Sequence, residues 1–274
     1  MIEYSCADFT FPVLGHEQAL KLIKLMGFDW VDIGLFTDRS HIQPEDQLDE
    51  PAKKGAMLSH LAGEIGLGIS DVFLQSALDC NDRAINHPDT KIRQEEREKF
   101  KRLVEYTLAA GCEHITCLPG VHTGTPDCND ICAEELSFRC EYARKFGITY
   151  SIEPHLGSIM STPKDALYML ERCEDLTLTL DHSHYISQGF STDDVTPLVK
   201  YAKHFHVRGA SNGNMQTSVK ESTTDFPKAL RGLKETNYAG KICFEYCWLE
   251  WENCNRTDNV SETLLLRELI EKAL

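Results

Sequence analysis

Four segments in the second half of the chain each end an apolar run with a side chain that can bind a metal ion. These side chains are Glu153, Asp181, His206 and Glu245. Carboxylates and imidazoles resist burial unless they are paired or bound to a cation, and three carboxylates in one place repel one another. We therefore predict that the four residues hold one divalent ion. The competing interpretation is a set of ion pairs at the edge of the fold.

The composition of this quartet also indicates which ion and which chemistry to expect. Three oxygen ligands and one imidazole suit Mn²⁺ first, with Mg²⁺, Co²⁺ or Zn²⁺ as alternatives. An ion of this kind polarises a carbonyl group, which makes the neighbouring C–H bond acidic. Glu153 and Glu245 are then the candidate bases, since a carboxylate can remove such a proton.

Three further residues are candidates for contact with a substrate or a proton. His155 lies two residues after Glu153 and Arg208 two residues after His206, and residues two apart share one face of a strand. His122 follows Leu118–Val121 and is a candidate general acid or base. The alternative for His155 is that it caps a loop, and the alternative for Arg208 is a structural ion pair. The alternative for His122 is a solvated loop histidine.

A repeating unit must position these residues. Short apolar runs alternate with amphipathic stretches, which is typical of parallel strands joined by helices. The expected strands are Glu3–Ser5, Trp30–Leu35, Ile69–Leu74, His114–Leu118, Thr149–Glu153, Leu176–Asp181, His204–Arg208 and Lys241–Tyr246. The expected helices are His16–Met26, Pro51–Ile65, Lys91–Ala110, Ala133–Phe146, one from Pro163, Val195–Ala202, Phe226–Glu235 and Thr263–Lys272.

Eight such units predict a closed (β/α)₈ TIM barrel, an α/β fold, as a single domain over residues 1–274. The alternative is an open doubly wound sheet, which would usually carry a glycine-rich turn after its first strand. No such turn follows Glu3–Ser5. Because the ends of barrel strands meet at one rim, the quartet is expected to converge there.

The composition of the chain indicates which classes of binding partner and which cellular compartment to expect. The 274 residues carry a formal net charge of −15, which disfavours binding to nucleic acid. No run is long and apolar enough for a membrane span, and the N-terminal residues do not resemble a signal peptide. The 11 cysteines are scattered, which favours free thiols in the reducing cytoplasm. A homo-oligomer is compatible with the sequence.

The quartet and the eight units resemble the xylose isomerase-like TIM barrels, which include sugar phosphate isomerases and epimerases, the AP endonuclease family 2-like proteins and, more distantly, endonuclease IV. The resemblance extends from Gly27-Phe28-Asp29 to the closing helix. It implies that Glu153, Asp181, His206 and Glu245 bind the metal. It also implies that His184, three residues after Asp181, contacts the substrate.

The chain departs from relatives in this family at specific places. The extra histidines of endonuclease IV are missing from Asp32–Phe36 and Asp71–Gln75, which disfavours a phosphodiesterase. The epimerases have a glutamate where this chain has Ile159 and an arginine where it has Asn212. We therefore expect recognition of the substrate to differ from that of the ketohexose enzymes.

The sequence thus predicts a sugar isomerase or epimerase that works through an enediolate. The alternative is a lyase that cleaves 3-keto-glycosides by elimination, with His122 as the acid. Gln75 and Trp248–Trp251 give that alternative a weaker resemblance to the large subunits of C-glycoside deglycosidases. A non-catalytic sugar-binding barrel is a third hypothesis, and it offers no reason for four metal ligands.

Overall fold

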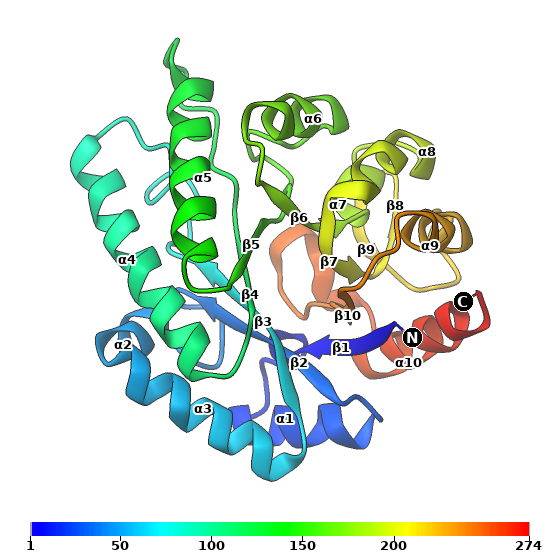
Figure 1. Cartoon of the computed structure of the whole chain (residues 1–274). Helices are drawn as coiled ribbons and strands as arrows, with labels where there is room; N and C mark the ends of the chain where they lie inside the picture. The colour runs from blue at the N-terminus through cyan, green and yellow to red at the C-terminus, as the bar shows by residue number, and fades with distance from the viewer. Residues whose placement is uncertain (1, 274) are drawn as a thin grey trace.

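The computed structural model, which describes residues 2–273, is a closed barrel of eight parallel strands surrounded by helices (Figure 1). The barrel order is β1-β10-β7-β6-β5-β4-β3-β2. The strands are β1 (Glu3–Ala7), β2 (Trp30–Phe36), β3 (Gly68–Gln75), β4 (His114–Cys117), β5 (Thr149–Ile152), β6 (Thr177–Asp181), β7 (Ala202–Val207) and β10 (Lys241–Phe244). The predicted TIM barrel is therefore confirmed.

Helices connect the strands and cover the outside of the barrel. They are α1 (His16–Leu25), α2 (Pro44–Asp49), α3 (Pro51–Ile65), α4 (Thr90–Ala109), α5 (Cys128–Arg144), α6 (Pro163–Arg172), α7 (Ser183–Ile186), α8 (Thr192–Val195), α9 (Phe226–Glu235) and α10 (Asn259–Ala273). Three 3₁₀ helices, η1 (Asp8–Thr10), η2 (Thr196–Tyr201) and η3 (Trp251–Arg256), lie between them. The helices expected over Pro51–Ile65 and Phe226–Glu235 have the predicted bounds.

One predicted helix is wrong. Of the residues expected to form an α-helix over Val195–Ala202, Val195 ends α8, Thr196–Tyr201 form η2, and Ala202 begins β7. Ser191 and Asp194 form a reciprocal capping box that begins α8. Pro197 has no N–H group to donate back along an α-helix, and its ring crowds the carbonyl four residues earlier, so a regular α-helix is disfavoured here.

Several bounds also differ, and one loop has more structure than expected. Helix α5 begins at Cys128 rather than Ala133. Helix α10 begins at Asn259, because the Asp258 carboxylate accepts hydrogen bonds from the backbone N–H groups of Val260 and Ser261. The loop after β7 contains a hairpin of β8 (Gly209–Ser211) and β9 (Asn214–Thr217).

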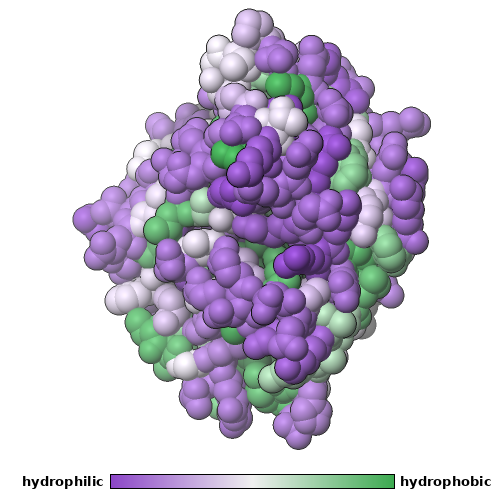
Figure 2. Space-filling view, turned by 90° about the vertical axis from the view of Figure 1, so that its left-hand side faces the viewer, coloured by the Kyte–Doolittle hydropathy of each residue, from purple (hydrophilic) through white to green (hydrophobic). Residues whose placement is uncertain are grey.

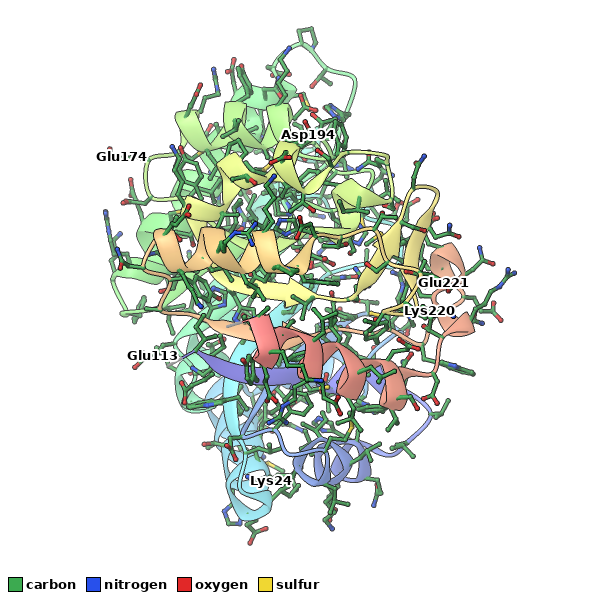
Figure 3. The ribbon with its side chains drawn as sticks, turned by 90° about the vertical axis from the view of Figure 1, so that its right-hand side faces the viewer. Lys24, Glu113, Glu174, Asp194, Lys220 and Glu221 are labelled. Carbon is green, nitrogen blue, oxygen red and sulfur yellow. The ribbon has the colours of Figure 1, made fainter. Side chains whose placement is uncertain are left out.

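The surface is mainly hydrophilic. Figure 2 shows one face on which hydrophobic areas are small and separated from one another. On another face, the charged side chains of Glu113, Glu174, Asp194, Lys220 and Glu221 are exposed (Figure 3). None of the helices within residues 2–273 is long and apolar enough to cross a membrane. Charged groups inside the barrel are therefore the exception, and they mark the part of the molecule where chemistry is expected.

Candidate metal centre

The quartet lies at the carboxyl ends of β5, β6, β7 and β10. Asp181 is the last residue of β6, and His206 is its partner in β7. Glu153 and Glu245 each come one residue after their strand. All four side chains are almost fully buried. We call these four residues the rim cluster.

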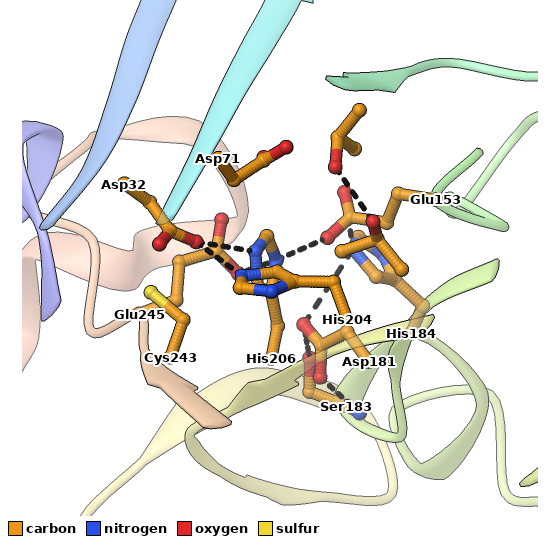
Figure 4. Close-up of polar contacts among 12 residues, drawn as sticks. Asp32, Asp71, Glu153, Asp181, Ser183, His184, His204, His206, Cys243 and Glu245 are labelled. Carbon is orange, nitrogen blue, oxygen red and sulfur yellow. Dashed lines mark hydrogen bonds and ion pairs between the residues drawn. The ribbon is translucent and has the colours of Figure 1, made fainter. Parts of the chain in front are cut away.

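His206 is at the centre of the rim cluster (Figure 4). Its Nδ1 atom lies 2.8 Å from Glu153 Oε1 and 3.3 Å from Glu245 Oε2. Donor atoms of these three residues lie within 4.8 Å of one another, which is close enough for one ion to bind all three. The structure thus brings together three of the four predicted ligands directly.

Asp181 joins the cluster through Arg208. The Arg208 Nη2 atom lies 2.9 Å from Asp181 Oδ2 and 3.5 Å from Glu245 Oε2, so the guanidinium group is between two predicted ligands. Asp181 also accepts hydrogen bonds from the N–H and the hydroxyl group of Ser183, at 2.8 and 2.6 Å. Arg208 is buried, and it contacts the predicted ligands rather than solvent.

The charges of the rim cluster favour ionised carboxylates. Burial alone would raise the pKa of Glu153, but hydrogen bonds from His184 and His206 outweigh it and hold the pKa well below its usual range. Burial likewise opposes ionisation of Asp181, and Arg208 and His184 lower its pKa nevertheless. Burial would lower the pKa of His206, but Glu245, Asp32 and Glu153 raise it well above its ordinary value.

One atom in this cluster indicates room for a cation. Glu245 Oε2 is buried and forms no hydrogen bond with any residue of the described chain, since its contacts with His206 and Arg208 are ion pairs by distance only. An unsatisfied buried carboxylate oxygen is costly without a cation. The arrangement of Glu153, His206 and Glu245 therefore fits a divalent ion. Both oxygens of Asp181 accept hydrogen bonds from Ser183 or Arg208, so its role as the fourth ligand stays a prediction.

Two further predicted residues pack beside the rim cluster. The His184 Nε2 atom lies 3.5 Å from Glu153 Oε2 and 3.7 Å from Asp181 Oδ2. The rings of His155 and His184 have centroids 4.2 Å apart, and Trp251 is next to both. Burial, followed by the charge of His184, lowers the pKa of His155 to about 3, so this ring is neutral at physiological pH.

His122 is not brought to the cluster. It lies in the loop between β4 and α5 with an exposed side chain, and it forms no hydrogen bond or ion pair within residues 2–273. Trp248, which the sequence placed with Trp251, is 45% exposed, whereas Trp251 packs on His155.

A second group of buried polar residues lies in the barrel next to the rim cluster. This inner layer consists of Asp32, Asp71, His114 and His204. Asp32 Oδ2 lies 2.5 Å from His204 Nε2 and 3.3 Å from His206 Nε2, and Asp32 Oδ1 accepts a hydrogen bond from Ser70. His114 Nδ1 lies 2.6 Å from Asp71 Oδ1. Asp32 thus contacts the nitrogen of His206 that faces away from Glu153.

The contact with Asp32 has a consequence for the histidine. In the metal-free protein both nitrogens of His206 face carboxylates, and its pKa is raised. Once the Nδ1 proton is lost, an Nε2–H donating to Asp32 would leave Nδ1 with the lone pair that a metal ligand requires. The sequence had not singled out Asp32 as part of the site. The available signal was a carboxylate in the middle of the apolar strand Trp30–Phe36, because a buried charge in a strand needs a partner.

The comparisons with known proteins agree with this architecture. Residues 20–269 match the family described as xylose isomerase-like TIM barrel. The chain belongs to this family. A comparison with curated protein sequences gave no match.

Solved structures show the same fold at low sequence identity. A structure of L-ribulose 3-epimerase is 17% identical, with a TM-score of 0.78 over 100% of this chain and 95% of that one. A D-allulose 3-epimerase from Methylomonas sp., in complex with D-allulose, is 17% identical, with a TM-score of 0.74 over 100% and 97%. A xylose isomerase-like TIM barrel protein from Mycobacterium smegmatis, in complex with magnesium, is 16% identical, with a TM-score of 0.71 over 94% and 87%.

Proposed function

We infer that the protein is a divalent-metal-dependent isomerase or epimerase of a sugar, which acts by removing a proton next to a carbonyl group. The observation that carries this proposal is the convergence of Glu153, His206 and Glu245, with Glu245 Oε2 buried and without a hydrogen bond in the described chain. The similarity to ketose 3-epimerases and to a magnesium-bound family member supports it.

In this proposal a bound divalent ion, Mn²⁺ by preference, supplies polarisation of the substrate carbonyl, which makes the adjacent C–H bond acidic. Glu153 is held ionised by His184 and His206, so it can accept a proton at neutral pH. Glu245 approaches the same imidazole nitrogen, His206 Nδ1, and so is near the same substrate atoms. We assign the two carboxylates as the pair that removes and returns the proton.

The position to which the proton returns decides the outcome. Removal of the proton next to the carbonyl gives an enediolate of the sugar. Return of a proton to the opposite face of the same carbon gives an epimer, whereas return to the neighbouring carbon gives an isomer. His155, which is neutral, and His184 are assigned to the sugar hydroxyl groups. The cationic Arg208 is assigned to an oxygen atom of the substrate beside Asp181.

The first experiment measures metal content. Purified protein should contain about one divalent ion per chain, and Asp181→Ala and His206→Ala should each lose most of it. The matched controls are Asp193→Ala and His60→Ala, whose side chains are 70% and 76% exposed and should leave metal content unchanged. Full metal content in the Asp181→Ala, His206→Ala double variant would exclude the proposed site.

The second experiment measures the reaction. Wild-type protein with Mn²⁺ should exchange a C–H proton of one member of a panel of ketoses, inososes and 3-keto-glycosides with D₂O. Absence of exchange on the whole panel, in protein that holds its metal, would argue for a sugar-binding barrel instead.

A further inference from the structure

A cavity of about 400 Å³ lies beside the rim cluster and includes none of its four residues. It is formed by the end of β3 and the loop after it, the end of β4 with the residues that follow it, the start of the loop after β5, and Trp251. Arg39 from the loop after β2 and residues of α4 and α5 complete its walls. We call it the side cavity. Its volume is within the range of pockets that hold small molecules, roughly 300–1,000 Å³.

The side cavity is one side chain away from the predicted metal ligands. His155 lines it, and the His155 ring packs on His184 at a centroid distance of 4.2 Å. The Nε2 atom of His184 in turn lies 3.5 Å from Glu153 Oε2. The rings of His155, His184 and Trp251, which pack on one another, therefore separate the side cavity from the rim cluster by the thickness of a side chain.

The walls of the side cavity are suited to an apolar group. Its lining includes Ala77, Leu78, Leu118, Val121, Leu156 and Trp251. The side chain of Leu78 is 49% exposed to solvent. Covering such an apolar side chain with an apolar group of a ligand would be favourable, because it removes apolar surface from water. Trp251 supplies a flat ring surface, which favours a planar group by stacking.

The charged residues of the lining already have partners. Arg83 donates hydrogen bonds to Glu95 and Glu96, both at 2.8 Å. Arg139 donates to Glu135 at 2.8 Å. Arg39 donates to the backbone carbonyl of Leu78, which leaves its charge without a carboxylate partner among the described residues, but the carboxylates of Asp79 and Glu96 line the same cavity. No lining residue within the described chain has a buried polar side-chain atom without a hydrogen bond. Recognition of a phosphate needs cationic donors that are available to it, so the lining favours an uncharged occupant.

We propose that the side cavity binds an uncharged, largely apolar group, of the size of an aryl ring, carried by the sugar that binds at the rim cluster. This rests on the proposed function, and it narrows the substrate class from free sugars and sugar phosphates to sugars with an apolar substituent. The proposal is independent of whether the reaction ends in epimerisation, isomerisation or elimination.

The test compares two probes that differ only in the substituent. Methyl and phenyl 3-keto-β-D-glucopyranoside are titrated calorimetrically into Mn²⁺-loaded protein. The phenyl probe should bind about 10- to 100-fold more tightly, because its ring leaves water for the side cavity. Equal binding, weaker binding of the phenyl probe, or no detectable binding of it would overturn the proposal.

Two variants test whether the preference for the phenyl probe arises in the side cavity. Ala77→Trp fills the side cavity from a half-buried loop position and should remove the preference for the phenyl probe. Ala239→Trp is the control, since Ala239 is exposed in the loop before β10, at the opposite end of the barrel. If Ala77→Trp does not fold, Leu78→Ser reports on the same wall and should reduce the preference. A preference that survives both substitutions at the side cavity would also overturn the proposal.

Different results would contradict the proposed function and the proposed binding of an apolar group in the side cavity. The methyl probe should bind more tightly to Mn²⁺-loaded than to chelated protein if the rim cluster takes the sugar, whatever the side cavity does. Loss of that metal dependence counts against the proposed function, whereas loss of the phenyl preference with metal dependence intact counts against the side cavity alone.

Discussion

The barrel contains two buried clusters of the same residue types, and they differ in how their charges are balanced. In the inner layer, each carboxylate has an imidazole of its own: Asp32 contacts His204 and Asp71 contacts His114. In the rim cluster, three carboxylates share His206, His184 and the guanidinium group of Arg208.

This difference distinguishes a structural network from a candidate reaction centre. The inner layer consists of hydrogen-bonded carboxylate–imidazole pairs, in which only one oxygen, Asp71 Oδ2, is buried without a hydrogen bond in the described residues. The rim cluster brings three carboxylates together, and donor atoms of Glu153, His206 and Glu245 lie within 4.8 Å of one another. The possible ligand group that includes the inner layer, Asp32 and His204 with His206 and Cys243, contains a single carboxylate. Oxygen-rich sites are the ones that hard divalent cations prefer, so we place the chemistry at the rim and assign a supporting role to the inner layer.

The largest effect is expected at the proposed bases. Glu153→Gln and Glu245→Gln each retain an oxygen ligand but remove the basic carboxylate. Metal should remain at least partly bound, while exchange of the substrate C–H proton into D₂O falls roughly 10²- to 10⁴-fold. Elemental analysis and proton NMR measure the two quantities on the same sample.

The opposite result has a clear meaning. If both variants exchange protons at the wild-type rate with metal in place, the rim cluster is only a metal cage. The distinction between the two clusters would then be wrong, and His155, which packs beside the rim cluster, would become the leading candidate for the base.

A smaller effect is expected when the inner layer is changed. Asp32→Asn should weaken metal binding about 10- to 100-fold, because Asp32 contacts the Nε2 atom of His206 and so orients a proposed ligand. Asp71→Asn is the matched control: Asp71 contacts His114, which does not touch the rim cluster, so metal affinity should stay within about threefold. Equal losses in the two variants would show that the inner layer acts by general stability instead.

The sequence predicted the barrel well because each unit carries its own local signals. The bounds Pro51–Ile65 depend on a proline at the first turn and Gly66, with a positive φ of 84°, at the end. The prediction failed at two local features: over η2, where Pro197 interrupts an otherwise helical stretch, and over β8 and β9, two strands of three and four residues that are too short to show an alternating pattern.

In the candidate site, too, some residues could be predicted from the sequence and others could not. The four rim residues could be predicted since each ends a strand, and strand ends converge in a barrel. The role of Asp32 could not, because its contact with His206 joins residues 174 positions apart. The position of Arg208 between Asp181 and Glu245 likewise depends on the closure of the barrel.

Removal of the metal should lower the melting temperature by a few degrees, since an ion that binds only the folded chain stabilises it by mass action. The difference between Mn²⁺-loaded and chelated protein should grow from about pH 6 to about pH 8. His206 has a raised pKa in the metal-free protein, so its stabilising charge is fully present at low pH and is lost as pH rises through that pKa. Protons and metal then compete for the same nitrogen.

Thermal melts at several pH values, with and without chelator, measure this difference. A difference that stays constant or shrinks as the pH rises would mean that His206 is not a ligand. Asp71→Asn again serves as the control, because it should leave the pH trend unchanged.

The smallest effect on proton exchange is expected at His122. Its side chain is exposed and has no hydrogen bond or ion pair within the described residues, so His122→Ala should leave C–H exchange within about twofold of wild type. Elimination makes a further demand, because the departing group needs a proton, and a general acid contributes roughly 10²- to 10⁴-fold. Product release from phenyl 3-keto-β-D-glucopyranoside should therefore be measured on the same variant. If product release is lost while C–H exchange is intact, His122 is the acid of a lyase. If both activities are fully retained, His122 has no role in proton transfer, and the rim cluster is sufficient for it.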